Sequence, residues 1–177
     1  MEFVDLNDDR RLDIVTFEFT RLVGRSIVWL EQPAAADQPW TLHAIGHYAP
    51  DEVVGLSAAD IDGDGKPDVM TGGYSAGGRN ADDTNVTSAS GRLAWYRHPG
   101  DAKGTWTRHD ISRRRRGMFD KFVPRDMDGD GDIDFATTRG NSGTFDGVFW
   151  LEQVRSRNAT AAFTRARPED STELSLP

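Results

Sequence analysis

Aspartate occurs at alternate positions in two short stretches of the chain, a spacing suited to binding a metal ion. Residues 60–68 read DIDGDGKPD, and residues 126–134 read DMDGDGDID. A hard cation such as Ca²⁺ takes about six to eight oxygen ligands at roughly 2.3–2.6 Å, and a short loop with alternating carboxylates can wrap around one. Carboxylates this close repel one another unless a cation neutralises them. The two stretches therefore predict two calcium sites.

The expected ligands are the side chains at positions 1, 3, 5 and 9 of each stretch and the backbone carbonyl at position 7. In the two stretches these residues are Asp60, Asp62, Asp64, Lys66 and Asp68, and Asp126, Asp128, Asp130, Asp132 and Asp134. Glycines at positions 4 and 6 permit a tight, partly left-handed turn. An EF-hand loop requires Glu at position 12, where this chain has Thr71 and Thr137. The stretches are therefore not EF-hands.

A third stretch, DLNDDRRLD at residues 5–13, has the same spacing but an altered turn. Its expected ligands are Asp5, Asn7, Asp9, Arg11 through its carbonyl, and Asp13. Asp8 and Arg10 replace both glycines, and a left-handed backbone is unfavourable for residues with a side chain. Metal binding and a metal-free turn both stay open for this stretch. A solvated turn is the alternative for all three stretches, because Asp and Gly are common turn residues.

The composition of the chain excludes several classes of function. The 177 residues contain no cysteine, which rules out disulfides, Cys-ligated zinc and thiol catalysis. A formal charge of −8 disfavours nucleic acid as a partner. No apolar run approaches the roughly 18 residues that a membrane span requires, and no signal peptide is visible at the N-terminus.

The tryptophans show that the three stretches belong to a sequence repeat. A tryptophan follows the last aspartate of each stretch, after 16 residues in the first and third units and after 27 in the second. These residues are Trp29, Trp95 and Trp150. From Trp29 to Asp60 and from Trp95 to Asp126 the distance is 31 residues in both cases. The sequence therefore contains a repeat of about 55 residues with one insertion of 11.

Each repeat reads as four short strands separated by Gly, Pro and Asp. In the second unit the predicted strands are 52–59, 67–73, 91–98 and 105–111, and the third unit repeats the first and third of them at 118–125 and 147–153. The first unit begins in its aspartate stretch, without a predicted strand before Asp5. The predicted fold is all-β, a partial β-propeller of about three four-stranded antiparallel blades with the aspartate stretches between the first two strands. Unrelated hairpins or a sandwich are the alternative.

DIDGDGKPDV and DMDGDGDIDF resemble the calcium loops of FG-GAP or VCBS repeats, the blades of integrin-α-like β-propellers. The resemblance covers residues 1–153 and implies one Ca²⁺ per loop and an extracellular or periplasmic location. The tail, 154–177, lacks the repeat apart from a faint echo of a fourth strand, FTRA at 163–166. Because propellers close with about four to eight blades, we expect a C-terminal fragment of a longer chain whose remaining blades are its partners.

Features outside the repeat are the candidates for ligand binding. They are the inserted loop at 72–92 and an arginine run, both expected opposite the calcium loops, with Tyr74, Arg79, Arg113, Arg114, Arg115 and Arg116 as the possible ligand face. His43 and His109 occupy matching places in two units, which indicates an architectural role, and no catalytic constellation is found. The expected function is a calcium-stabilised, non-catalytic module that binds protein or carbohydrate. The alternative is the propeller part of a polysaccharide lyase or sugar dehydratase acting on acidic or modified sugars.

Overall fold

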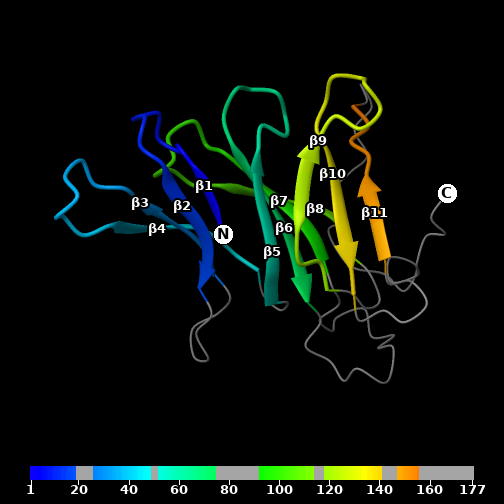
Figure 1. The fold of residues 1–177 in the computed structure, drawn as a ribbon, viewed down its shortest axis with the longest axis horizontal. Helices are drawn as coiled ribbons and strands as arrows, with labels where there is room; N and C mark the ends of the chain where they lie inside the picture. The colour runs from blue at the N-terminus through cyan, green and yellow to red at the C-terminus, as the bar shows by residue number, and fades with distance from the viewer. Residues whose placement is uncertain (19–25, 49–51, 75–91, 114–117, 141–146, 156–177) are drawn as a thin grey trace.

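The computed structural model describes residues 1–18, 26–48, 52–74, 92–113, 118–140 and 147–155. Within these residues the chain forms antiparallel strands arranged as three sheets side by side (Figure 1). No helix suited to crossing a membrane occurs in the described part of the chain.

The strands of each sheet follow one another in sequence order. The first sheet contains β1 (Glu2–Val4), β2 (Asp13–Glu18), β3 (Ser26–Glu31) and β4 (Thr41–His47); the second contains β5 (Glu52–Ala59), β6 (Asp68–Tyr74), β7 (Arg92–Arg97) and β8 (Thr107–Arg113); the third contains β9 (Phe122–Arg125), β10 (Asp134–Arg139) and β11 (Gly147–Leu151). Every pairing is antiparallel between sequence neighbours, which is the topology of a propeller blade.

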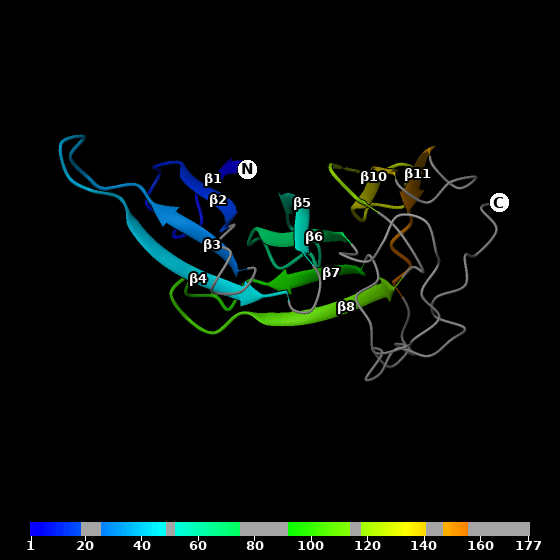
Figure 2. The ribbon, with the colours of Figure 1, turned by 90° about the horizontal axis from the view of Figure 1, so that it is seen from below.

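The sheets stand in a row, with their first strands along one side. β1 contacts β5, and β5 contacts β9. Figure 2 shows β4 and β8 along the opposite side of the row. This arrangement is a partial β-propeller, as the repeat predicted.

Two hydrophobic cores fill the spaces between the sheets. The first, between the first and second sheets, contains Trp29, Tyr48 and Tyr96, all buried. The second, between the second and third sheets, contains Phe119 and Phe122. Burying one such side chain stabilises the fold by about 1.5–3 kcal/mol. Contacts between blades therefore supply much of the stability of each blade.

Two glycines permit the close approach of the second and third sheets. A Cβ on Gly55 would lie 2.0 Å from the backbone oxygen of Phe119, and a Cβ on Gly72 would lie 2.6 Å from the Cβ of Phe119 and 2.7 Å from the ring of Phe122. β6, which contains Gly72, is buried along almost its whole length. It is therefore the central strand between two packed faces.

The first two blades also share a shift in strand register at equivalent positions. β3 and β4 shift register between Ile27 and Val28, and β7 and β8 shift register between Leu93 and Ala94. The two positions are 66 residues apart, the same offset that separates Trp29 from Trp95. The first two blades thus share a bulge as well as a strand order.

The structure corrects the predicted start of the first blade. A strand, β1, does precede Asp5, and its Phe3 pairs with Ile14 of β2. Three residues are too few to display alternation, so the sequence pattern missed it. The third sheet has three strands within the described residues, and the segment 163–166 lies outside them.

Candidate metal-binding loops

The three aspartate stretches form the loops between the first and second strands of the sheets. We call residues 5–13, 60–68 and 126–134 the first, second and third loops. They join β1 to β2, β5 to β6 and β9 to β10. The β5–β6 and β9–β10 connections rise on the same side of the row, at the top of Figure 1. The predicted placement of the loops is therefore correct.

The second loop is wound around the carboxylate of Asp60. Its two oxygens accept hydrogen bonds from the backbone amides of Gly63, at 2.8 Å, and Gly65, at 2.9 Å. Both glycines have a positive φ, 78° and 85°, as the tight turn predicted. The carboxylate of Asp62 accepts a bond from the amide of Asp64 at 3.2 Å. The backbone thus turns its amides inward onto the acidic side chains.

The third loop repeats this geometry. Asp126 accepts bonds from the amides of Gly129, at 2.7 Å, and Gly131, at 3.1 Å. Asp128 accepts from the amide of Asp130 at 3.2 Å. The two loops are therefore wound in the same way.

The last aspartate of each loop is buried and ties the loop to the third strand of its sheet. Asp13, Asp68 and Asp134 each accept from the amide that follows the first aspartate of the loop. Each also accepts from the amide three residues after the repeated tryptophan, namely Gln32 at 2.9 Å, His98 at 2.7 Å and Gln153 at 2.8 Å. Burial raises the pKa of Asp68 to about 6, despite these hydrogen bonds. The position-9 carboxylate thus has a structural role that does not depend on a metal.

Carboxylate oxygens converge in the second and third loops. Within the described residues, oxygens of Asp60, Asp62 and Asp68 lie within 4.8 Å of one another, and so do oxygens of Asp126, Asp128 and Asp130. The second loop contains four aspartates and one lysine, a net charge of −3, and the third contains five aspartates and no cation, a net charge of −5. All-oxygen donors with excess negative charge fit a hard divalent cation such as Ca²⁺.

Two arginines beside these loops were not anticipated from the sequence. Arg97 Nε lies 2.5 Å from Asp62 Oδ2, and Arg97 Nη2 lies 3.4 Å from Asp64 Oδ2. Arg155 lies 3.6 Å from Asp132, whose buried side chain has a raised pKa because of desolvation and the neighbouring Asp130. Arg97 stands two residues after Trp95, on the same strand face, and Glu31 stands two residues after Trp29. A charged residue two positions after the repeated tryptophan was therefore the feature of the sequence from which these contacts with the loops could have been predicted.

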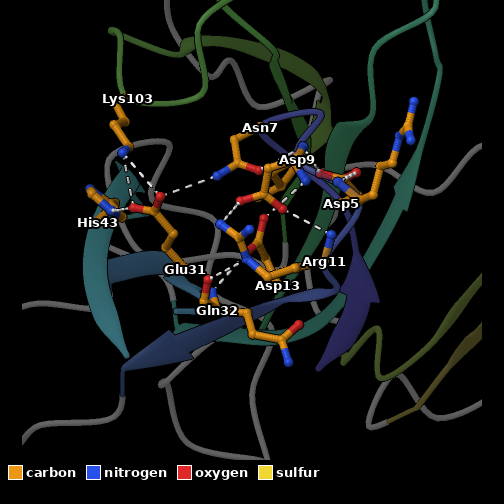
Figure 3. A network of polar contacts seen from close by, with 11 residues as sticks. Asp5, Asn7, Asp9, Arg11, Asp13, Glu31, Gln32, His43 and Lys103 are labelled. Carbon is orange, nitrogen blue, oxygen red and sulfur yellow. Dashed lines mark hydrogen bonds and ion pairs between the residues drawn. The ribbon is translucent and has the colours of Figure 1, made fainter. Parts of the chain in front are cut away.

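The first loop follows the same backbone path without glycine. Asp8 and Arg10 have φ values of 60° and 68°, where the other loops have glycine. Such a conformation costs roughly 1–2 kcal/mol per residue with a side chain. The carboxylates of Asp5, Asp9 and Asp13 are not among those that converge within 4.8 Å. An ion pair between Arg11 and Asp9 lies in this loop instead (Figure 3).

The comparison with protein families agrees with this geometry. Residues 5–71 match the family model described as FG-GAP-like repeat. The chain contains an FG-GAP-like repeat. The matched segment runs from the first loop through the second loop into β6, so both loops belong to the FG-GAP-like region. No curated protein and no solved structure matches the chain.

The expected ligand face is only partly described. Tyr74 ends β6, where it pairs with Glu52 and forms a bridge with Met118. Arg113 is the last residue of β8 rather than part of the following connection, and it pairs with Arg92. The remaining candidates lie outside the described residues: Arg79, Arg114, Arg115 and Arg116.

An apolar pocket lies between the second and third blades. It is lined by Ile61, Met70, Trp95, Ile111, Ile133, Phe135, Leu151, Glu152 and Gln153. The lining comes from five strands, β6, β7, β8, β10 and β11, and from segments between or after strands, so no single stretch of sequence indicates it. Ile61, Met70 and Phe135 also belong to the second hydrophobic core, so the pocket borders that core.

Proposed function

We propose that the chain is a calcium-stabilised, non-catalytic β-propeller module that binds a protein or carbohydrate outside the cell or in a periplasm. The observation that carries the calcium part is the convergence of three carboxylates in each of the second and third loops. Calcium bound there would neutralise the repulsion among these carboxylates and hold the first and second strands of a blade together. Side chains of both loops would supply the ligands, with Lys66 and Asp132 contributing backbone carbonyls.

The ligand-binding part of the proposal rests on the position of the loops in the fold. Loops on one face of a rigid scaffold are common binding surfaces. We assign ligand binding to the face opposite the calcium loops, which includes the end of β6 at Tyr74 and the end of β8 at Arg113. The extracellular or periplasmic location follows from the usefulness of weak calcium sites where calcium is millimolar.

Thermal unfolding of the full chain, followed by circular dichroism, tests the calcium assignment. In a few millimolar calcium the melting temperature should exceed that in excess EGTA, because a ligand that binds only the folded state stabilises it by about 2.7 kcal/mol at 100 times Kd. A melting temperature unaffected by chelation would refute the assignment.

Calorimetric titration of variants assigns the ions to loops. Asp62→Asn and Asp128→Asn each keep an oxygen that can accept the loop hydrogen bond but remove a charge. Each should lose or greatly weaken one of two calcium ions. The exposed Asp37→Asn, in the turn between β3 and β4, is the matched control and should bind as the wild type does. Two ions retained in both loop variants would contradict the proposal.

A further inference from the structure

We propose that the first loop is a metal-free counterpart of the other two, closed by the guanidinium of its own Arg11 in place of a calcium ion. Under the proposed function the second and third loops depend on metal, whereas the first loop is held by its own arginine. This inference goes beyond the proposed function, because it can be true whether or not the other loops bind calcium.

The backbone of the first loop turns its amides onto its first aspartate, as in the other two loops, although from positions 5 and 6 rather than 4 and 6. Asp5 accepts from the amides of Asp9, at 3.1 Å, and Arg10, at 2.7 Å. Asp9 accepts from the amide of Arg11 at 2.8 Å, as the corresponding Asp64 does from Lys66 at 2.9 Å. The loop keeps this path although Asp8 and Arg10 have positive φ. Some interaction must therefore compensate for the loss of both glycines.

Arg11 provides that interaction from within the loop. Its Nη2 pairs with the carboxylate of Asp9, and its Nε donates to the backbone oxygen of Gln32 at 3.1 Å. Figure 3 shows the guanidinium between these two groups. Gln32 also donates its own amide to Asp13, the last aspartate of the loop. One side chain thus joins the middle of the loop to the end of β3.

Asn7 is neutral where the other loops have aspartate. Its Oδ1 accepts from the amide of Asp9 at 3.3 Å, as Asp62 accepts from Asp64. Its Nδ2 donates to Glu31 at 3.2 Å, and Glu31 also contacts Lys103, at 3.0 Å, and His43, at 2.8 Å. In the second loop the corresponding residues are Asp62 and Arg97, so there the loop residue is negative and the strand residue is positive. Asn7 therefore brings one fewer negative charge to the first loop, and its amide nitrogen is engaged by Glu31.

Charge explains why an arginine can serve here and not in the other loops. The first loop contains four aspartates, two arginines and the neutral Asn7, a net charge of −2, compared with −3 and −5 for the other loops. Arg97 also contacts the second loop, yet three carboxylates still converge there. In the first loop no such set forms among the described residues, so a divalent ion would meet fewer carboxylates and a competing guanidinium.

Stability measurements in EGTA test the role of Arg11 without any metal. Arg11→Gln should lower the melting temperature by roughly 2–4 °C, because Asp9 loses its charged partner. Arg10→Gln removes the same charge from the neighbouring, exposed position of the same loop and should change it little. Equal effects of the two substitutions, or no effect of Arg11→Gln, would overturn the proposal.

Calcium titration of the full chain tests the absence of a metal at the first loop. The double variant Asp62→Asn/Asp128→Asn should bind no calcium in the low millimolar range. The proposal would be overturned if this variant still bound one ion and lost it when Asp5→Asn was added. Asn7→Asp/Arg11→Gln should gain one ion relative to the wild type, and no gain would count against Arg11 as the substitute for the ion. If the wild type binds no calcium at all, the proposed function fails while the Arg11→Gln comparison in EGTA still decides this inference.

Discussion

Trp95 and His109 stack face to face across neighbouring strands, with ring centroids 4.4 Å apart and planes 18° apart. Trp29 and His43 form the same pair in the first blade, at 4.4 Å and 22°. Each pair is directly opposite in the strand register. A histidine stacked at the same place in two blades has a packing role, which agrees with the expectation from the repeat.

Replacement of His109 by Ala should lower the free energy of unfolding by about 1–2 kcal/mol, because it removes an aromatic pair and part of the cover of Trp95. Urea denaturation measures the change. Thr107→Ala, at an exposed position on the same strand, should stay within about 0.5 kcal/mol of the wild type. A stability unchanged by His109→Ala would show that the stack is incidental.

His109 also predicts a dependence of stability on pH. Burial, with a smaller effect from Arg97, lowers the pKa of this imidazole in the folded state. As pH falls below about 6.5, the ordinary pKa of histidine, the unfolded chain takes up the proton first. Stability should therefore be lost as pH falls through this range towards the folded pKa. His109→Phe keeps a ring but cannot titrate, so its urea midpoint should fall less between pH 7 and pH 5 than that of the wild type; parallel curves would contradict the assignment.

Gly55→Ala should destabilise the contact between the second and third blades. The added methyl carbon would lie 2.0 Å from the backbone oxygen of Phe119, and backbone cannot move aside as the end of a side chain can. We expect a loss of about 3 kcal/mol in the free energy of unfolding. Gly147→Ala is the matched control, since nothing lies within 4 Å of its added carbon. Similar melting temperatures for the two variants would mean that the blades do not pack this closely.

Asp68→Asn separates the structural role of the loops from their metal-binding role. The buried carboxylate accepts from the amides of Ile61, at 3.0 Å, and His98, at 2.7 Å. An asparagine presents an NH₂ group to one of these donors, so we expect a loss of about 2–3 kcal/mol even in EGTA. Asp64→Asn, at a partly exposed position, should cost little in EGTA and act only when calcium is present. If Asp68→Asn lowered the free energy of unfolding only when calcium is present, this division between structural and metal-binding roles would be contradicted.

The regular spacing of aspartate and tryptophan predicted the fold well. Alternation and turn residues placed β5 at 52–59, as observed, and placed β6, β7 and β8 within two residues at each end. β1 was missed because its three residues carry no period. The sequence left the turn of the first loop open, and the structure shows that Asp8 and Arg10 adopt the left-handed backbone that glycine adopts in the other two loops.

The sequence by itself determined the strand order, the repeat and the identity of the acidic loops, because these depend on local period and on the spacing of charges along the chain. Only the tertiary structure decided which side chains face each loop. Arg97 at the second loop and Glu31 at the first arrive from the third strand of the blade, and Arg155 arrives after the last described strand. Their contacts depend on strand register and sheet twist, which local sequence patterns do not specify. The contact of Arg11 with the backbone oxygen of Gln32, at the end of β3, depends on the same pairing and distinguishes the first loop from the other two.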